Sequence, residues 1–241
     1  MRLSTALTST SLLFFFSQSH IPLAHAAVST KSVEFELRDP KTKEVYFTAT
    51  EKSSLDGNAV HKETVYFDAS KKEVQKESFA FDSSSLKAID YSSTNALTGE
   101  ESGLTSKNAA FQLSYRANRE SKMAAMTLES GKDFFLAKAA GDLILMNWDN
   151  LVSGKAVKFD LAVPSRLETI PFQIVKRETA TVDNESREVF SLMPQNLLIR
   201  MLAPHLEFQY SQDKKMRQAF FPSALPIRGA KDKMVEMIVK G

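Results

Sequence analysis

Apolar and polar residues alternate along most of this chain. An alternation with a period of two predicts β-strands that bury one face and expose the other. The apolar positions of these segments are Val33/Phe35/Leu37, Val45/Phe47/Ala49, Val65/Phe67, Phe79/Phe81, Ala109/Phe111/Leu113/Tyr115, Val157/Phe159/Leu161/Val163, Ile170/Phe172/Ile174, Leu206/Phe208/Tyr210 and Val235/Met237/Val239. Turn-forming sequences such as Asp56-Gly57-Asn58 separate them. The sequence therefore predicts a mainly β fold, either a single curved antiparallel sheet or a half-open barrel or sandwich.

Two segments interrupt the alternation, and each predicts a short helix. The first covers residues 142–152 and ends at Gly154, a residue type that commonly follows a helix. Its buried stripe would be Leu143, Met146 and Leu151, with Trp148 near the edge. The second covers residues 195–203 and lies between Pro194 and Pro204. One or two short helices of this kind would cover an opening or a face of the curved sheet.

The first 26 residues have the features of a cleaved signal peptide. Arg2 provides a positive start, an apolar stretch around Phe14 follows, and Ala24-His25-Ala26 form an A-x-A cleavage site. An uncleaved membrane anchor is the alternative, but the apolar run is shorter than the roughly 20 residues that span a bilayer. No later stretch is apolar enough to cross a membrane. We therefore expect an exported protein whose mature part, residues 27–241, forms a single mainly β domain.

Composition narrows the possible functions. The chain has 241 residues, 31 Lys and Arg against 29 Asp and Glu, and no Cys. The near-balance of charge provides no strong attraction to nucleic acid. The absence of Cys excludes a disulfide scaffold, a zinc finger, a cysteine-ligated cluster and a thiol nucleophile. An exported chain without Cys is typical of the bacterial envelope, so we predict a periplasmic location, with secretion as the alternative.

The sequence carries no familiar catalytic signature. It contains no nucleophile elbow, P-loop, dinucleotide-binding glycine motif or zinc-protease motif. His61 and His205 are far apart, so we expect no metal ligands and no cofactor. The charged run 71–77 is mixed in sign and predicts a solvent-exposed hairpin. We predict a non-enzymatic protein without catalytic residues. An atypical hydrolase is a minor alternative, because the members of a Ser–His–Asp triad need not be adjacent in sequence.

The most distinctive part of the sequence is the segment 147–169, which holds the single Trp, a helix end, a strand and a Pro-Ser-Arg turn. One interpretation makes Trp148, Arg166 and Glu168 part of a ligand or partner site. In the alternative, which we favour, Trp148 is a core residue that anchors the helix on the sheet, and Arg166 pairs with a carboxylate.

The same segment carries a family resemblance. Its motif residues are Asn147-Trp148-Asp149, Leu151, Gly154, Phe159, Val163-Pro164-Ser165-Arg166, Thr169 and Phe172. Later matches are Pro194, Asn196, Leu198, Arg200 and Leu202 in a helix, and Leu206, Phe208 and Tyr210 in a strand. On these residues the chain resembles exported bacterial proteins of the domain-of-unknown-function 3108 type. The layout agrees over roughly residues 31–240, but Phe221-Pro222-Ser223 stands where that family has a glycine-bearing turn.

The resemblance implies a curved antiparallel sheet and an envelope location, and it implies no catalytic residues. It also adds Asn196 and Arg200 to the candidate ligand or partner residues. Two functions follow from these observations. The first is the binding of a lipid or another apolar small molecule inside the curved sheet. The second is an interaction or assembly module that pairs an exposed edge strand with another envelope protein. They differ in whether the interior of the sheet is a cavity or a filled core.

Overall fold

The computed structural model describes residues 30–107, 110–128, 134–202, 206–227 and 233–240. The predicted signal peptide, Ala109, the last residue of the second predicted helix (Ala203), Pro204 and His205 lie outside these residues. Within them the chain is built mainly from strands that form one large curved sheet, with three short α-helices. The predicted fold class is therefore confirmed.

One sheet contains all the described strands. The strands are β1 (Lys31–Arg38), β2 (Val45–Asp56), β3 (Ala59–Phe67), β4 (Glu73–Asp82), β5 (Ala88–Asn95), β6 (Glu101–Lys107), β7 (Ala110–Arg116), β8 (Ala124–Leu128), β9 (Phe134–Leu136), β10 (Val157–Val163), β11 (Glu168–Val182), β12 (Glu185–Pro194), β13 (Leu206–Ser211), β14 (Met216–Pro222) and β15 (Met234–Lys240). The α-helices are α1 (Ala140–Met146), α2 (Trp148–Val152) and α3 (Leu197–Leu202). Two single-turn 3₁₀ helices are η1 (Ala137–Ala139) and η2 (Pro164–Arg166).

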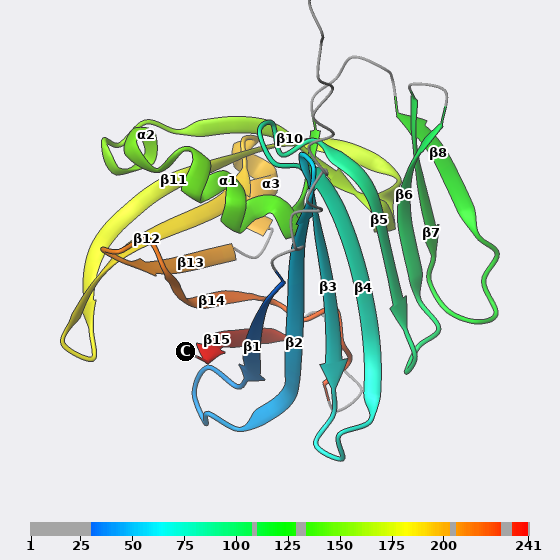
Figure 1. The fold of residues 1–241 in the computed structure, drawn as a ribbon, viewed down its shortest axis with the longest axis horizontal. Coiled ribbons are helices and arrows are strands. Elements are labelled where there is room, and N and C mark those ends of the chain that lie inside the picture. Colours follow the sequence, from blue (N-terminus) through cyan, green and yellow to red (C-terminus); the bar gives the residue numbers. More distant parts are fainter. Residues whose placement is uncertain (1–29, 108–109, 129–133, 203–205, 228–232, 241) are drawn as a thin grey trace, which may run out of the picture.

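The sheet consists of two sets of consecutive strands, β1 to β8 and β9 to β15, which are joined in the middle of the sheet by β1 and β15. Its order runs from β8 back to β1, continues to β15, and then runs back to β9. β1 and β15, which lie far apart in the sequence, pair antiparallel and place Phe35 opposite Val239. β9 and β10 form a parallel pair. The pairing of β1 with β15 makes the two halves one continuous sheet (Figure 1).

The sheet curls so that its two ends approach each other without pairing. Register shifts bend five strand pairs, at Leu37/Arg38, Tyr66/Phe67, Ala80/Phe81, Lys176/Glu178 and Gln209/Tyr210. β9, a terminal strand of the sheet, contacts β5 of the other half. η2, which connects β10 to β11, contacts β6 and β7 of that half. In the described sheet, β8 and β9 are the two ends, and each has a single strand neighbour. The result is a half-open barrel.

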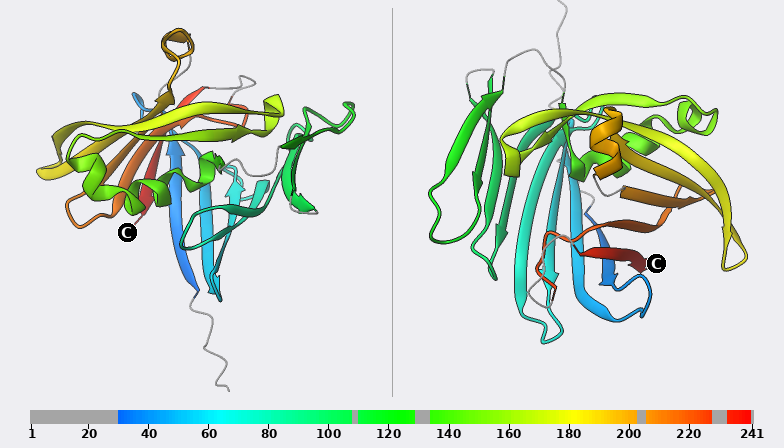
Figure 2. Two further views of the ribbon diagram at one scale, coloured as in Figure 1. Left: turned by 90° about the horizontal axis from the view of Figure 1, so that it is seen from above. Right: turned by 180° about the vertical axis from the view of Figure 1, so that it is seen from behind.

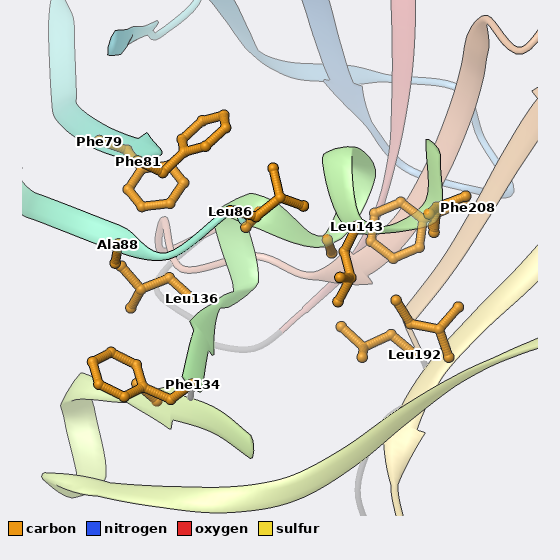
Figure 3. Packing of buried hydrophobic residues seen from close by; sticks show 14 of the residues in the cluster. Phe79, Phe81, Leu86, Ala88, Phe134, Leu136, Leu143, Leu192 and Phe208 are labelled. Atoms are coloured by element: carbon orange, nitrogen blue, oxygen red, sulfur yellow. The ribbon is translucent and has the colours of Figure 1, made fainter. Parts of the chain in front are cut away.

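The segment from η1 to α2 lies between the two halves of the sheet (Figures 1 and 2). Its buried side chains belong to the same apolar cluster as buried residues of both halves. Figure 3 shows Leu143 of α1 next to Phe208 and Leu192. Trp148 is only 8% exposed, and its ring lies 5.3 Å from that of Phe190. This segment covers the concave face, as predicted for the first helix.

The first helix differs from its prediction in one respect, because it is two helices. Asn147 has φ −107° and ψ 19°, outside the helical region, and therefore interrupts the helix between α1 and α2. Met146, predicted in the buried stripe, is 47% exposed, whereas Leu143 and Leu151 are buried. The predicted stop is confirmed, since Gly154 adopts φ +87° directly after α2.

The second predicted helix is present as α3, but it does not cover the sheet. Figure 2 shows it standing away from the strands. Four of its large apolar side chains are exposed, namely Leu197, Leu198, Ile199 and Met201. Of the one or two covering helices expected, the structure therefore has the first alone covering the sheet among the described residues.

One strand presents the opposite face from that predicted. The alternation places Val65 and Phe67 of β3 in the core, yet neither belongs to an apolar cluster of the described residues. Instead Thr64 is buried, and Lys62 and Tyr66 line a cavity on the same inner face. Since neighbouring residues of a strand point to opposite sides, Val65 and Phe67 occupy the outer face. The inner face of β3 is polar because its side chains find partners there.

We expect Trp148→Ala to lower the free energy of unfolding by about 3–5 kcal/mol, since it removes a buried indole from the contact between α2 and the sheet. Urea denaturation followed by circular dichroism measures the change. Met146→Ala, in the preceding helix but exposed, is the matched control and should change stability by less than about 0.5 kcal/mol. Equal stability of the Trp148→Ala protein and the wild type would show that the residue does not anchor the helix.

Candidate functional site

A cavity of about 470 Å³ lies between the curved sheet and the segment η1–α1. One wall is apolar and comes mainly from β1, β2 and the strands β13 to β15. Its residues include Phe35, Leu37, Ala49, Leu206, Phe208, Met216, Phe221 and Met237. The other wall is largely polar and comes from β2, β3, β4 and the helical segment. Its residues are Glu51, Lys62, Thr64, Tyr66, Gln75, Glu77, Lys138 and Asp142. The interior of the sheet is therefore not completely filled.

The polar wall results from strand alternation on β3 and β4. Lys62, Thr64 and Tyr66 are two residues apart and share the inner face of β3. Gln75 and Glu77 share the inner face of β4 in the same way. The charged run 71–77, predicted to be a solvent-exposed hairpin, thus contributes two buried polar side chains. That prediction is wrong for the inner-facing positions of β4.

Lys138 of η1 connects the helical segment to this wall. Its ammonium group forms an ion pair with Glu77 and donates a hydrogen bond to the Tyr66 hydroxyl at 2.9 Å. Tyr66 donates to the Glu77 carboxylate at 3.0 Å, and the Gln75 amide donates to the other carboxylate oxygen at 2.9 Å. Glu77 is only 8% exposed, so these donors replace the water that it loses.

A second ion pair joins α1 to β3. The Lys62 ammonium lies 2.6 Å from the Asp142 carboxylate. The same ammonium lies 5.4 Å from the centre of the Phe81 ring, within the range of a cation–π contact. On β2, the Glu51 carboxylate accepts a hydrogen bond from the Thr64 hydroxyl at 3.2 Å. The polar wall is therefore arranged in small groups of partners that link three strands and the helical segment.

The surroundings of the cavity shift several pKa values. Burial, followed by the charge of Glu77, raises the pKa of Tyr91 to about 12 and raises the pKa of Tyr66 further above its usual value. Burial and the charge of Asp142 raise the pKa of Tyr210. Burial alone would lower the pKa of Lys138, but the charge of Glu77 and the hydrogen bonds outweigh it and hold this pKa well above its usual range. At neutral pH these tyrosines are uncharged and Lys138 is positive.

The candidate residues of the segment 147–169 do not line this cavity. Trp148 is a core residue whose ring also lies 5.8 Å from the Tyr210 ring. Arg166 and Glu168 form an exposed ion pair at 2.5 Å on the outside of the molecule. These positions agree with the alternative in which Trp148 anchors the helix and Arg166 pairs with a carboxylate. A ligand or partner role for Arg166 and Glu168 stays a prediction.

Asn196 and Arg200 shape the start of α3. The Asn196 side chain accepts hydrogen bonds from the backbone N–H groups of Leu198 at 2.9 Å and Ile199 at 3.2 Å, so it caps the helix. The Arg200 guanidinium donates to the carbonyl oxygens of Pro194 and Gln195, both at 3.0 Å. Both side chains lie away from the cavity lining, and their predicted role in binding stays a prediction.

The sequence did not predict the residues of the polar wall as a site, because they form no recognisable motif along the chain. The available signal was weak: polar residues two apart on β3 and β4, including one aromatic hydroxyl, Tyr66. His61 is exposed on β3. In the described part of the chain, no group of three or more His, Cys, Asp or Glu residues could hold a metal ion.

Comparisons with known proteins leave the family open. No protein-family model matches the chain, and no curated protein matches it in sequence. Among solved structures, it is similar to the crystal structure of a beta-barrel-like protein of domain of unknown function DUF1849 from Brucella abortus, with a TM-score of 0.46 and 10% identity. The similarity covers 88% of this chain and 94% of that one. Within the described residues, no helix has the length and apolarity needed to span a membrane.

We expect Tyr66, Tyr91 and Tyr210 to titrate late in the folded protein. Of the five tyrosines, these three should keep their protons at pH 11 and release them together on unfolding in urea. Because their pKa values are raised in the folded state, their contribution to stability is complete below pH 10 and is lost as the pH rises above it. Ultraviolet absorbance of the phenolate, with circular dichroism in parallel, measures both effects. Tyr66→Phe should remove one late-titrating group. Titration of all tyrosines near pH 10 in a protein that is still folded would contradict the burial of these three side chains.

Proposed function

We propose that this protein binds the apolar chain of a lipid-like ligand in the cavity between the sheet and α1, without catalysing a reaction. The observation that carries the proposal is the cavity itself, with its volume of about 470 Å³ and its largely apolar lining. Protein interiors are close-packed and contain few voids larger than a water molecule. Cavities that bind small molecules have volumes of about 300–1,000 Å³ and combine an apolar lining with a few polar groups.

The two walls suit different parts of such a ligand. An acyl or alkyl chain against Phe35, Leu37 and Met237 would give these side chains the contacts that an empty cavity denies them. The polar wall would meet a head group. The proposal is for binding because Lys138, Glu77 and Tyr66 are already engaged with one another, which holds them in place as a recognition surface.

The location belongs to the same proposal. The A-x-A site after an apolar stretch and the absence of Cys support an exported protein of the bacterial envelope, in the periplasm or secreted. The resemblance to the domain-of-unknown-function 3108 type supports the same location. In such an aqueous compartment, an apolar molecule is stabilised by binding in a protein cavity, because apolar side chains replace water around it.

Filling the cavity should abolish binding. Ala49 is buried on the inner face of β2, so Ala49→Trp would place an indole in the space that the apolar chain would occupy. We expect it to weaken the binding of N-phenyl-1-naphthylamine, an apolar fluorescent probe, by at least about tenfold, which corresponds to about 1.4 kcal/mol. Thr50→Trp, one residue further on the outer face, is the matched control and should bind the probe as the wild type does.

Circular dichroism establishes that both variants fold, and mass spectrometry of extracts from the natively purified protein detects any lipid that co-purifies. A wild-type protein that binds no probe and carries no lipid would refute the proposed function. Unchanged binding by a folded Ala49→Trp protein would place the probe outside this cavity.

A second candidate function is an assembly module, and strand β8 favours it. β8 is a terminal strand of the described sheet and pairs with β7 alone. Four of its five residues, Ala124 to Thr127, are exposed, and none is charged or Pro. Edge strands in soluble proteins usually carry such residues to prevent pairing with other chains. An edge that lacks them can accept a strand from a partner.

A photoreactive amino acid in place of Met126 tests this candidate. Met126 lies in β8 and is exposed. If β8 pairs with another envelope protein, irradiation of cells should yield one discrete covalent adduct through this position. Met146 is similarly exposed but lies on α1, so the same substitution there is the control and should yield no such adduct. The absence of any adduct specific to position 126 would remove this candidate.

A further inference from the structure

The charges of the cavity wall do not balance. Two lysines, Lys62 and Lys138, face three carboxylates, Glu51, Glu77 and Asp142. Each lysine forms an ion pair with a carboxylate of its own, Lys62 with Asp142 at 2.6 Å and Lys138 with Glu77. Within the described residues, the polar partner of Glu51 is the Thr64 hydroxyl at 3.2 Å, which is neutral. Among the described residues, Glu51 therefore forms no ion pair, because the lysines nearest to it are already paired with Glu77 and Asp142.

The charged groups are concentrated at one end of the cavity. A small recess that adjoins it is lined by Glu51, Lys62, Thr64, Glu77, Phe79 and Lys138. All of these except Phe79 also line the main cavity. In the recess, Glu51 of β2 lies with the Lys138–Glu77 pair and with Lys62. A ligand whose chain lies along the apolar wall would place its polar head at this end.

We infer that the ligand has a head group that donates hydrogen bonds, a primary amine or a hydroxyl, and that the cavity discriminates against carboxylate and phosphate heads. This inference rests on the proposed function and specifies the class of ligand. A cationic amine would supply the charge that Glu51 lacks, and a hydroxyl would donate to the same carboxylate. Such charge-assisted hydrogen bonds are stronger than those between neutral groups.

An anionic head meets an obstacle on this wall. It could bind Lys138 or Lys62 only by adding a fourth negative charge or by displacing Glu77 or Asp142 from its lysine. Displacement would leave Glu77, which is almost completely buried, without its cation. An uncompensated buried charge costs more than a new ion pair returns. The wall therefore favours a donor head over an acid.

Three ligands with the same twelve-carbon chain test the inference: dodecylamine, 1-dodecanol and dodecanoic acid. Isothermal titration calorimetry at pH 7, below the concentration at which each ligand aggregates, gives the three dissociation constants. We expect the amine to bind at least about tenfold more tightly than the acid, and the alcohol to lie between them. Glu51→Gln should reduce the preference for amine over acid by about tenfold. Glu63→Gln, the same change on the outer face of β3, is the matched control and should leave the preference unchanged.

The outcomes separate the inference from the proposed function. If none of the three ligands binds, the proposed function fails. If the acid binds as tightly as the amine, or more tightly, the cavity binds apolar chains but the inference about the head group is wrong. If the amine is preferred and Glu51→Gln does not change this preference, the assignment to Glu51 is wrong. A preference that Glu51→Gln reduces and Glu63→Gln preserves would support the inference.

Discussion

A curved sheet that does not close on itself must bury its concave face against something else, and the rest of this structure depends on how it does so. The segment η1–α1–α2 supplies the cover. One side of it, with Leu143, Ile144 and Trp148, packs into the main apolar cluster. The other side, with Lys138 and Asp142, forms ion pairs with β4 and β3 and lines the cavity. The same helical segment thus completes the core and forms one boundary of the candidate site.

The two ion pairs define where that segment lies. Both pairs join the helical segment to the sheet, but with opposite polarity. In one, Lys138 of the helical segment pairs with Glu77 of the sheet; in the other, Asp142 of the helical segment pairs with Lys62 of the sheet. Partly buried ion pairs contribute little net stability, since the loss of hydration offsets much of the attraction. Their reversed polarity has a geometric effect instead. A shift of the helix along the strands would bring Lys138 toward Lys62 or Asp142 toward Glu77, so only one position satisfies both pairs.

The sequence predicted the type of most elements but not the faces of all of them. The alternation is unambiguous on β1 and β2, where Phe35, Leu37, Phe47 and Ala49 are buried as expected. On β3 it is misleading, because hydrophobicity alone assigns Val65 to the inside and Lys62 to the outside. The inner face is polar because residues distant in the sequence supply partners there: Asp142 pairs with Lys62, and Lys138 donates to Tyr66. A pairing of this kind exists only after folding, so the candidate site could not be predicted from the chain alone.

The same polar residues explain why a cavity persists inside the sheet. If the two walls moved together, Phe208 and Met237 would press against Glu51, Lys62 and Glu77, and these charged groups would lose the remaining water without gaining partners. If the polar wall were apolar, the walls could meet and fill the core as in an ordinary barrel. The side chains that made β3 and β4 resemble solvent-exposed strands are therefore those that keep the interior open. Their misassignment in the sequence and the existence of the site have one physical cause.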